Sequence, residues 1–287
     1  MRSAAILILA MVLAGFHPET VFAQNTGQNT RISPSTCLAV ADNQQTGPRI
    51  INASYQPPAR SAAQLAALEN GEVLITYVGH SAFRIETAQG VVAVTDYNGF
   101  SGEGALPDIV TMNHAHSTHY TDSPNPLISH VLRGWNPDGD DPASHHLELR
   151  DMLVRNVTTD IYYEGSLIEK DGNSIFIFET AGLCIGHLGH LHHKLTPEHI
   201  ARIGRIDVLF MPVDGTYTMS QAGMIELAGQ LRSSIVIPMH YFSTFSLQRF
   251  IAGMQDKFAL QVEPGTSTRV SLADLPSSPQ VRVLSAY

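Results

Sequence analysis

Short apolar runs separated by glycine, proline and polar turns make up most of the chain beyond residue 70. The runs are rich in Val, Ile and Phe and have the length of β-strands rather than of helices. Strands are predicted over residues 73–78, 82–86, 91–95, 108–113, 155–161, 174–179, 182–186, 206–212 and 234–238. Gln89-Gly90 is typical of a hairpin turn between the second and third of these strands.

Helical patterns are concentrated in the later part of the chain. Thr196 followed by Pro197 is a favoured N-cap and first-turn pair, and the predicted helices span residues 196–203, 220–231 and 246–258. Residues 124–148 are dense in Pro, Gly and Asp and are predicted to form a long loop over one face. Strands followed by alternating strands and helices indicate a mixed α/β sandwich, with its chemistry at the carboxyl ends of strands.

The amino terminus has the pattern of an export signal. Arg2 precedes an apolar run from Ala4 to Phe16, and small residues at Val21 and Ala23 predict cleavage after Ala23. The run is too short for an ordinary transmembrane helix, although a retained anchor is the alternative. We therefore expect a signal peptide over residues 1–23, a periplasmic or secreted protein, and no membrane contact after cleavage.

Two further parts of the chain follow from the same pattern. Residues 24–70 are polar and proline-rich, with a short helical patch at 62–68, and are predicted to be an N-terminal extension packed on the domain formed by residues 71–287. Cys37 lies in the extension and Cys184 in an apolar strand of the domain. An inert buried thiol at Cys184 is the favoured interpretation, and a disulfide formed in an oxidising compartment is the alternative.

Composition narrows the class of partner. Hydrophobic residues are 44% of the chain and charged residues 15%, which is enough apolar material for a well-formed core. The net charge of −9 argues against nucleic-acid and anionic-membrane partners, which require basic patches. A small-molecule substrate is therefore expected, and the sequence carries no signature of an oligomeric state.

Histidines mark the ends of several predicted strands. The chain has 14 histidines, and two clusters stand out, His114-Ala-His116-Ser-Thr-His119 and His187-Leu-Gly-His190-Leu-His192-His193. A lone histidine, His240, stands at the end of a third predicted strand, 234–238. Because neutral imidazole is a favoured ligand of transition metals, histidines at three strand ends predict a metal site.

The order of these motifs resembles the metallo-β-lactamase superfamily, closest to its ascorbate-phosphate-lactonase-like branch of metal-dependent hydrolases, over roughly residues 71–260. The motifs are Gly79-His80-Ser81, Thr95-Asp96, His114-x-His116-x-x-His119, Gly186-His187-Leu-Gly-His190, Met211-Pro-Val-Asp-Gly215 and Pro238-Met-His240. The resemblance implies an αββα sandwich with one or two metals and a metal-activated water as the nucleophile.

The chain departs from the family pattern at both acidic ligand positions. Thr118 stands where the family motif His-x-His-x-Asp-His has aspartate, and His190 where His-x-Gly-Asp has its bridging aspartate. The resemblance implies one metal site of His114, His116 and His187, and another that keeps His119 and His240 and recruits His190. Because neutral imidazole can neither bridge two metals nor offset their charge, we expect one zinc in the first site and a weak or absent second site.

Candidate catalytic residues also follow from the resemblance. Thr118 takes the position of the aspartate that orients the attacking water, and Asp214 is a possible substitute, with a turn residue as the alternative. Tyr241 is a candidate hydrogen-bond donor to substrate, with an ordinary strand-edge tyrosine as the alternative. Asp96 is a candidate for holding a ligand histidine, and His80 for lining the pocket, each with a structural turn role as the alternative.

The expected activity is hydrolysis of an ester, lactone, amide or phosphoester bond in a small molecule. Loss of both acidic ligands leaves a catalytically degenerate metal- or ligand-binding protein as the main alternative. An oxidoreductase with a redox metal in an all-nitrogen site is a third hypothesis.

Overall fold

The computed structural model describes residues 35–38, 68–139 and 141–285, all of which belong to one compact unit, Ser35–Tyr287. The predicted signal peptide and most of the helical patch at 62–68 lie outside the described residues. Among the described helices, none is long and apolar enough to cross a membrane.

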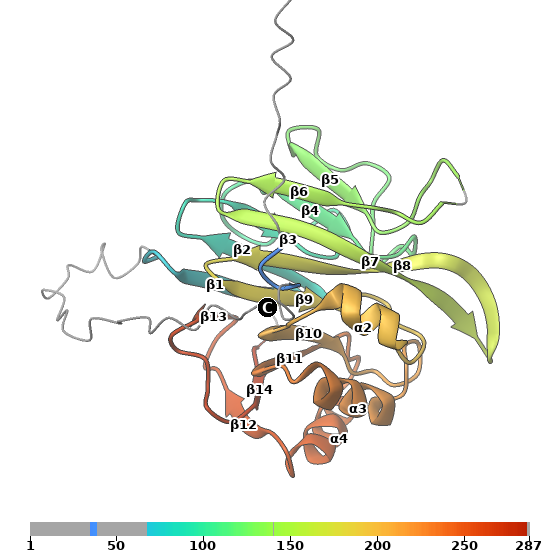
Figure 1. Cartoon of the computed structure of the whole chain (residues 1–287), viewed down its shortest axis with the longest axis vertical. Helices are drawn as coiled ribbons and strands as arrows, with labels where there is room; N and C mark the ends of the chain where they lie inside the picture. The colour runs from blue at the N-terminus through green and yellow to red at the C-terminus, as the bar shows by residue number, and fades with distance from the viewer. Residues whose placement is uncertain (1–34, 39–67, 140, 286–287) are drawn as a thin grey trace, which may run out of the picture. The chain divides into compact units, whose positions relative to one another are not determined.

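Two β-sheets form the body of the unit (Figure 1). The six-stranded sheet has the order β13-β1-β2-β3-β4-β5, and the eight-stranded sheet the order β12-β14-β11-β10-β9-β8-β7-β6. The first sheet consists of β13 (Ser267–Ser271), β1 (Glu72–Gly79), β2 (Ala82–Thr87), β3 (Val92–Val94), β4 (Ile109–Met112) and β5 (His130–Arg133). The second consists of β12 (Ala259–Val262), β14 (Gln280–Val283), β11 (Ile235–Met239), β10 (Val208–Pro212), β9 (Leu183–His187), β8 (Ser166–Thr180), β7 (Met152–Tyr163) and β6 (His146–Leu149).

The strands at the centre of the eight-stranded sheet are apolar on both faces. In β10, Val208 and Phe210 face the core between the two sheets, whereas Leu209 and Met211 face the helices. This explains the unbroken apolar runs in the sequence, because side chains alternate between two buried faces. The parallel pairing of β9, β10 and β11 brings their carboxyl ends to one edge of the sheet.

Three helices, α2 (Pro197–Ile203), α3 (Gln221–Leu231) and α4 (Thr244–Met254), contribute to the core on the outer side of the eight-stranded sheet. Each begins at a side-chain cap, provided by Thr196, Ser220 and Ser243 respectively. On the outer side of the six-stranded sheet, the described residues that cover β3 and β4 come from loops, including Tyr97, Ile128 and Trp135.

The predicted mixed α/β sandwich and its central strands are confirmed, although β7 and β8 extend well beyond the predicted 155–161 and 174–179, and three further parts differ. The predicted loop over 124–148 contains β5 and the start of β6, strands β12 to β14 were not predicted, and the last helix spans 244–254 rather than 246–258. The missed strands are short and partly polar, so that pairing with a neighbour rather than an apolar pattern defines them; β5, for example, pairs along β4.

The favoured interpretation of Cys184 as a free thiol was wrong, because Cys37 and Cys184 form a disulfide with Cα atoms 5.9 Å apart. The Glu179 carboxylate lies beside it and accepts hydrogen bonds from the Ser35 hydroxyl at 2.5 Å and the Thr36 amide at 2.9 Å. Residues 35–38 are therefore attached to the domain both covalently and by a buried carboxylate.

Candidate metal centre

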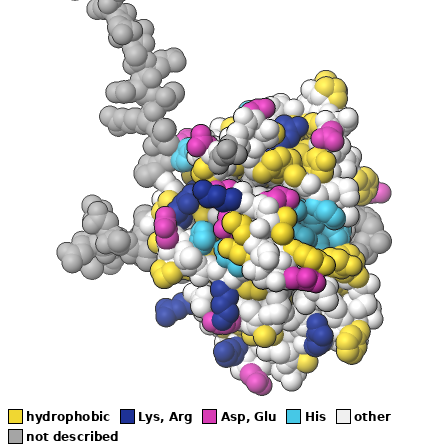
Figure 2. Space-filling model, turned by 90° about the vertical axis from the view of Figure 1, so that its right-hand side faces the viewer, with side chains coloured by type: hydrophobic (Ala, Val, Ile, Leu, Met, Phe, Trp, Pro, Cys, Tyr) yellow, Lys and Arg dark blue, Asp and Glu magenta, His cyan; other side chains and the backbone are white. Residues whose placement is uncertain are grey.

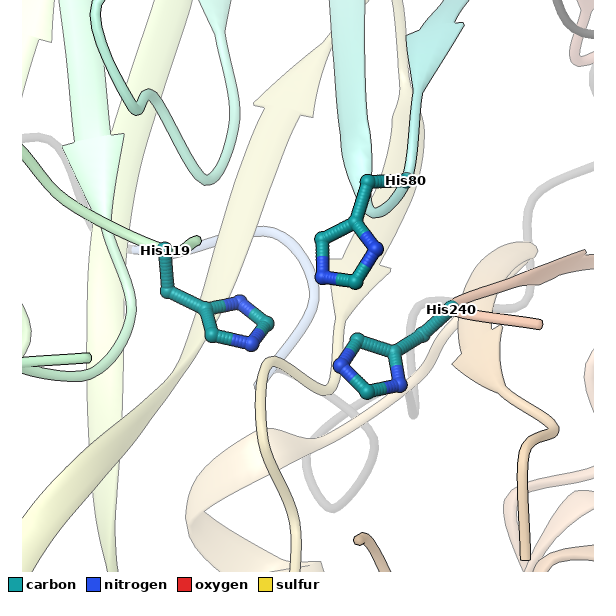
Figure 3. A group of neighbouring side chains, drawn as sticks. All are labelled: His80, His119 and His240. Carbon is teal, nitrogen blue, oxygen red and sulfur yellow. The ribbon is translucent and has the colours of Figure 1, made fainter. Parts of the chain in front are cut away.

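Three histidines from three separate elements converge on one point (Figure 3). His80 lies in the turn between β1 and β2, His119 follows β4, and His240 directly follows β11. One ring nitrogen of each lies within 4.8 Å of the others. His119 and His240 are buried and His80 is half-buried. The group has the size and donor type of a transition-metal site.

The backbone at this point is held in an uncommon conformation. His80, Asp96 and His240 have φ angles of 52°, 51° and 52°, in the left-handed region that residues other than glycine seldom adopt. The carbonyl of His80 accepts hydrogen bonds from the His240 amide and the Tyr77 hydroxyl, each at 2.7 Å. Such outliers persist where the surroundings enforce them, and they gather at functional sites.

Two buried carboxylates orient two of the three imidazoles. His119 Nδ1 lies 2.5 Å from Asp96 Oδ2, and His240 Nδ1 lies 3.1 Å from Asp214 Oδ1. An ionised carboxylate only accepts hydrogen bonds, so each Nδ1 carries the proton and each Nε2 keeps its lone pair. A carboxylate behind a ligand histidine is the usual second layer of a metal site.

Both carboxylates are held in the charged form. Burial alone raises the pKa of Asp96, but His119 and the Ser81 hydroxyl more than reverse this and hold the pKa well below its ordinary range. The pKa of Asp214 is likewise low despite burial, because His240 and the Thr218 hydroxyl donate to it. Two buried anions therefore lie directly behind the three imidazoles, which matches the charge of one divalent cation.

The ring nitrogens show whether these three histidines suit a metal ion. Nε2 of His80 and Nε2 of His119 are buried and have no hydrogen-bond partner within the described structure. Burial and the neighbouring histidines lower the pKa of His80 to about 4, which favours the neutral ring that binds a metal. Unsatisfied buried nitrogens are costly, and a bound metal ion satisfies them.

His190 lies beside this group, and a chain of hydrogen bonds determines which of its nitrogens is protonated. Its ring centroid is 4.7 Å from that of His119. His192 Nδ1 donates to the Tyr162 carbonyl at 2.5 Å, so that His192 Nε2 accepts from His190 Nδ1 at 2.9 Å. His190 Nε2 therefore keeps its lone pair, and burial with neighbouring histidines lowers the pKa of His190 to about 2.

His114 and His116 form a looser group with His190. The ring centroids are 5.3 Å apart for His114 and His190, and 6.1 Å apart for His116 and His190. His114 Nδ1 donates to the Gly172 carbonyl at 2.7 Å, which leaves Nε2 as the acceptor. His116 is exposed and its Nδ1 lies 3.1 Å from the hydroxyl of Thr118. His114 and His116 therefore lie beside the group of His80, His119 and His240 but are not part of it.

The expected site of His114, His116 and His187 does not form in this geometry. Nε2 of His187 donates to the Ser81 carbonyl at 2.7 Å, and Nδ1 accepts from the Gly189 amide at 3.0 Å and lies 3.1 Å from the Asn113 side-chain nitrogen. Neither nitrogen is left for a metal. His187 is fully buried and ties the end of β9 to the β1–β2 turn and to the segment after β4.

His80 completes the group with His119 and His240, where the sequence predicted His190. It was expected to line the pocket, yet it has the same signal as the others, a histidine directly after an apolar strand. Asp96 bonds to His119, a member of this group, and its role in holding a metal ligand stays a prediction. What the sequence could not indicate is that the β1–β2 turn closes over the segment after β4.

The three candidate catalytic residues occupy different environments. Asp214 is buried, and its carboxylate accepts hydrogen bonds from the Thr218 hydroxyl, the Tyr217 amide and His240, so it orients a ring rather than facing a water. Thr118 is exposed, and Tyr241 is half-buried against the core between sheet and helices. Their participation in catalysis stays a prediction.

Comparison with other proteins agrees with the motif order. The profile of the beta-lactamase superfamily domain matches residues 74–240, more than half of the chain. A UPF0173 metal-dependent hydrolase of Geobacillus sp. (strain WCH70) is 23% identical over 226 residues, covering 67% of this chain and 97% of that protein. A UPF0173 metal-dependent hydrolase of Thermoplasma volcanium is 26% identical over 197 residues, covering 61% of this chain and 86% of that protein.

Solved structures give the same result. A protein of Thermotoga maritima assigned to the Zn-dependent hydrolases of the metallo-β-lactamase superfamily superposes with a TM-score of 0.54 at 28% identity, covering 75% of this chain and all of that one. A protein of Parabacteroides distasonis assigned to the metal-dependent hydrolases shares the fold, with a TM-score of 0.52 at 17% identity over 75% of this chain and 94% of that one. Two facing sheets, histidines at strand ends and a matching domain profile together place this chain in the metallo-β-lactamase superfamily.

Proposed function

We propose that the protein is a metal-dependent hydrolase whose single zinc ion is bound by Nε2 of His80, His119 and His240. The observation that carries the proposal is a pair of buried Nε2 atoms, on His80 and His119 in a group of three imidazoles, that have no hydrogen-bond partner in the described part of the chain. When bound, a zinc ion lowers the pKa of a coordinated water and polarises the bond to be broken. The hydrolase names of the relatives support this assignment.

The residues of the chain have distinct parts in this proposal. Asp96 and Asp214 hold the rings of His119 and His240 with Nε2 unprotonated and offset the charge of one cation. The neutral His190 lies beside the centre without adding charge. Among the described residues, no comparable pair of buried carboxylates lies near His114 and His116, since Glu169, 3.7 Å from His114 Nδ1, is exposed. This asymmetry supports one metal per chain.

The proposed location is the periplasm or the extracellular space. The disulfide between Cys37 and Cys184 supports this location, because such bonds persist in oxidising compartments and are rare in the cytosol. The signal-like residues 1–23 support it independently. Alkylation of the protein from fractionated cells, with and without prior reduction, tests it: the thiols are expected to react only after reduction.

Metal analysis tests the central proposal. The chain, purified without a histidine tag, is expected to contain about one zinc, measured by elemental mass spectrometry, and to hydrolyse 4-nitrophenyl esters at a rate that a chelator abolishes. His119→Ala is expected to lose both the metal and the rate, whereas His116→Ala, a matched control on the exposed side of the cluster, keeps the metal. A metal-free wild type, or an equal rate in wild type and His119→Ala, contradicts the proposal.

A further inference from the structure

A cleft of about 710 Å³ opens beside the metal centre. One wall is the tip of the β7–β8 hairpin, residues 162–165, and the other is the segment 216–218 that follows β10. His190, His192 and His193 of the second histidine cluster also line the cleft, and the ring of His190 lies close to that of His119. Figure 2 shows a patch of histidine side chains bordered by hydrophobic side chains, with other histidines apart from it on the same face.

Exposed aromatic rings connect this cleft to the metal centre. The rings of Tyr217 and Phe242 meet edge to face with centroids 5.6 Å apart, and Phe242 lies 5.2 Å from His240 and 5.7 Å from His80. Tyr217, Phe242 and, on the opposite wall, Tyr163 are each more than 60% exposed. Large aromatic side chains left in solvent around a cleft are typical of a surface that binds an apolar ligand.

The described residues that line the cleft include no lysine or arginine that could pair with an anionic substrate. Among the described residues that line it, Glu164 carries the only fixed charge. Lys194, next to the lining residue His193, pairs with Glu226 at 2.5 Å. Arg249 approaches the neighbouring Gly215 but donates its Nε–H to Gln221 at 2.7 Å. Apart from a metal ion itself, phosphate recognition relies on arginine, lysine or free backbone amides.

The backbone amides of segment 216–218, which lines the cleft, already donate hydrogen bonds within the protein. The amides of Thr216, Tyr217 and Thr218 all donate to Oδ2 of Asp214, at 2.8, 2.6 and 3.2 Å. Three successive amides of this kind form a nest that would otherwise bind an anionic oxygen. Here the protein's own carboxylate fills it, so a phosphate or carboxylate group of a substrate finds no donor there.

We infer that the site takes an uncharged carbonyl substrate, an ester or lactone with an aromatic or bulky apolar group that packs on Tyr217 and Phe242, in preference to a phosphoester. This inference rests on the proposed hydrolase function. In the reaction, the water oxygen bonds to the acyl carbon and the bond from that carbon to the alkoxy oxygen breaks. The leaving oxygen takes one proton, and the acid that forms releases the other to solvent.

Matched substrates test the inference. We expect kcat/KM of the zinc-loaded protein to be about tenfold higher for 4-nitrophenyl phenylacetate than for 4-nitrophenyl acetate, and lowest for bis(4-nitrophenyl) phosphate. Tyr217→Ala is expected to reduce the preference for phenylacetate over acetate to near unity, mainly through KM. Leu260→Ala, which removes an exposed apolar side chain of β12 outside the cleft, leaves the preference and the rate unchanged.

A binding measurement separates this inference from the hydrolase proposal. Calorimetry is expected to detect binding of 4-phenyl-2-butanone, a neutral ketone that cannot be hydrolysed, weakened by Tyr217→Ala, and no binding of phenyl phosphate. Metal-dependent turnover that favours the phosphodiester, or failure of the ketone to bind, overturns the inference. Binding of the ketone without turnover of any substrate supports the inference about the cleft and contradicts the hydrolase proposal.

Discussion

The imidazole of His119 shows how a buried side chain is prepared for a metal. Asp96 holds Nδ1 at 2.5 Å and the hydroxyl of Ser81 donates to the same carboxylate oxygen, while Nε2 has no partner among the described residues. The ring is thereby oriented and its tautomer determined before any metal binds. Preorganisation of this kind raises metal affinity, because little is left to order on binding.

Replacing this carboxylate is expected to weaken metal binding without removing a ligand. Asp96→Asn keeps the size of the side chain but loses its charge, so we expect zinc affinity to fall about 10- to 100-fold. Competition with a chromophoric chelator measures the affinity. Asp151→Asn, which alters a carboxylate bonded to Thr87 away from the three histidines, is the matched control and should leave the affinity unchanged. Equal zinc affinities of the Asp96→Asn and Asp151→Asn variants would show that the charge of Asp96 does not contribute to metal binding.

His187 is expected to matter for stability rather than for metal binding. It is fully buried and both of its nitrogens are engaged, so His187→Ala leaves a cavity and unpaired polar groups. We expect the free energy of unfolding to fall by about 3 kcal/mol, measured by urea denaturation. The folded variant should retain about one zinc. Loss of the metal from a folded variant would restore His187 to the ligand set.

At the scale of elements, strands β7 and β8 bind the segment of residues 35–38 through a buried ion pair. Arg155 Nε donates to Glu179 Oε1 at 2.7 Å, and the same guanidinium donates to the carbonyls of Arg202 and Ile203 at the end of α2. Glu179 in turn accepts from residues 35–37. Removing one partner of a buried pair is costly because the other remains charged and unpaired.

Glu179→Gln is therefore expected to destabilise the protein by about 3 kcal/mol near neutral pH. Burial alone raises the pKa of Glu179, but the hydrogen bonds from Ser35 and Arg155 hold it below its ordinary value of 4.5. Because the folded-state pKa is the lower one, this contribution is present above pH 4.5 and is lost as the pH falls below it. Thermal melts between pH 3 and 7 measure both effects, and the variant should show the shallower loss on acidification. An equal slope in both proteins would contradict this.

At the scale of the whole molecule, the disulfide joins positions 147 residues apart in sequence. Cys184 lies near the start of β9 and His187 at its end. The disulfide and His187 are thus attached to the same strand, β9, but near its opposite ends. A disulfide stabilises the fold mainly because it lowers the conformational entropy of the unfolded chain. This stabilisation is larger when the bond closes a long loop.

Reduction of this bond is expected to lower stability and leave the metal centre intact. The double variant Cys37→Ser, Cys184→Ser should lose about 2–5 kcal/mol of unfolding free energy, observed as a lower Tm. Dithiothreitol should lower the Tm of the wild type in the same way and have no effect on the double variant. Zinc content should stay at about one per chain. A wild-type Tm that does not respond to reduction would contradict the prediction.

Much of the architecture followed from local pattern. Central strands such as Val208–Pro212 are apolar on both faces, and helix α2 begins at a strong cap, so each could be located from its own residues. The order of histidine motifs likewise indicated the superfamily and a metal. Strands such as His130–Arg133 could not be located in this way, because they exist through pairing with β4 rather than through their own pattern.

Local sequence therefore determined that histidines stand at strand ends, which indicates a metal site there. Which histidines come together with a free ring nitrogen was decided only in three dimensions, by partners remote in sequence. The Ser81 carbonyl occupies one nitrogen of His187, whereas Asp96 and Asp214 leave Nε2 of His119 and His240 unprotonated. The physical reason is that imidazole offers one lone pair, and its position depends on what the other nitrogen bonds to. Cys37 and Cys184 illustrate the same rule, since only folding brings them together.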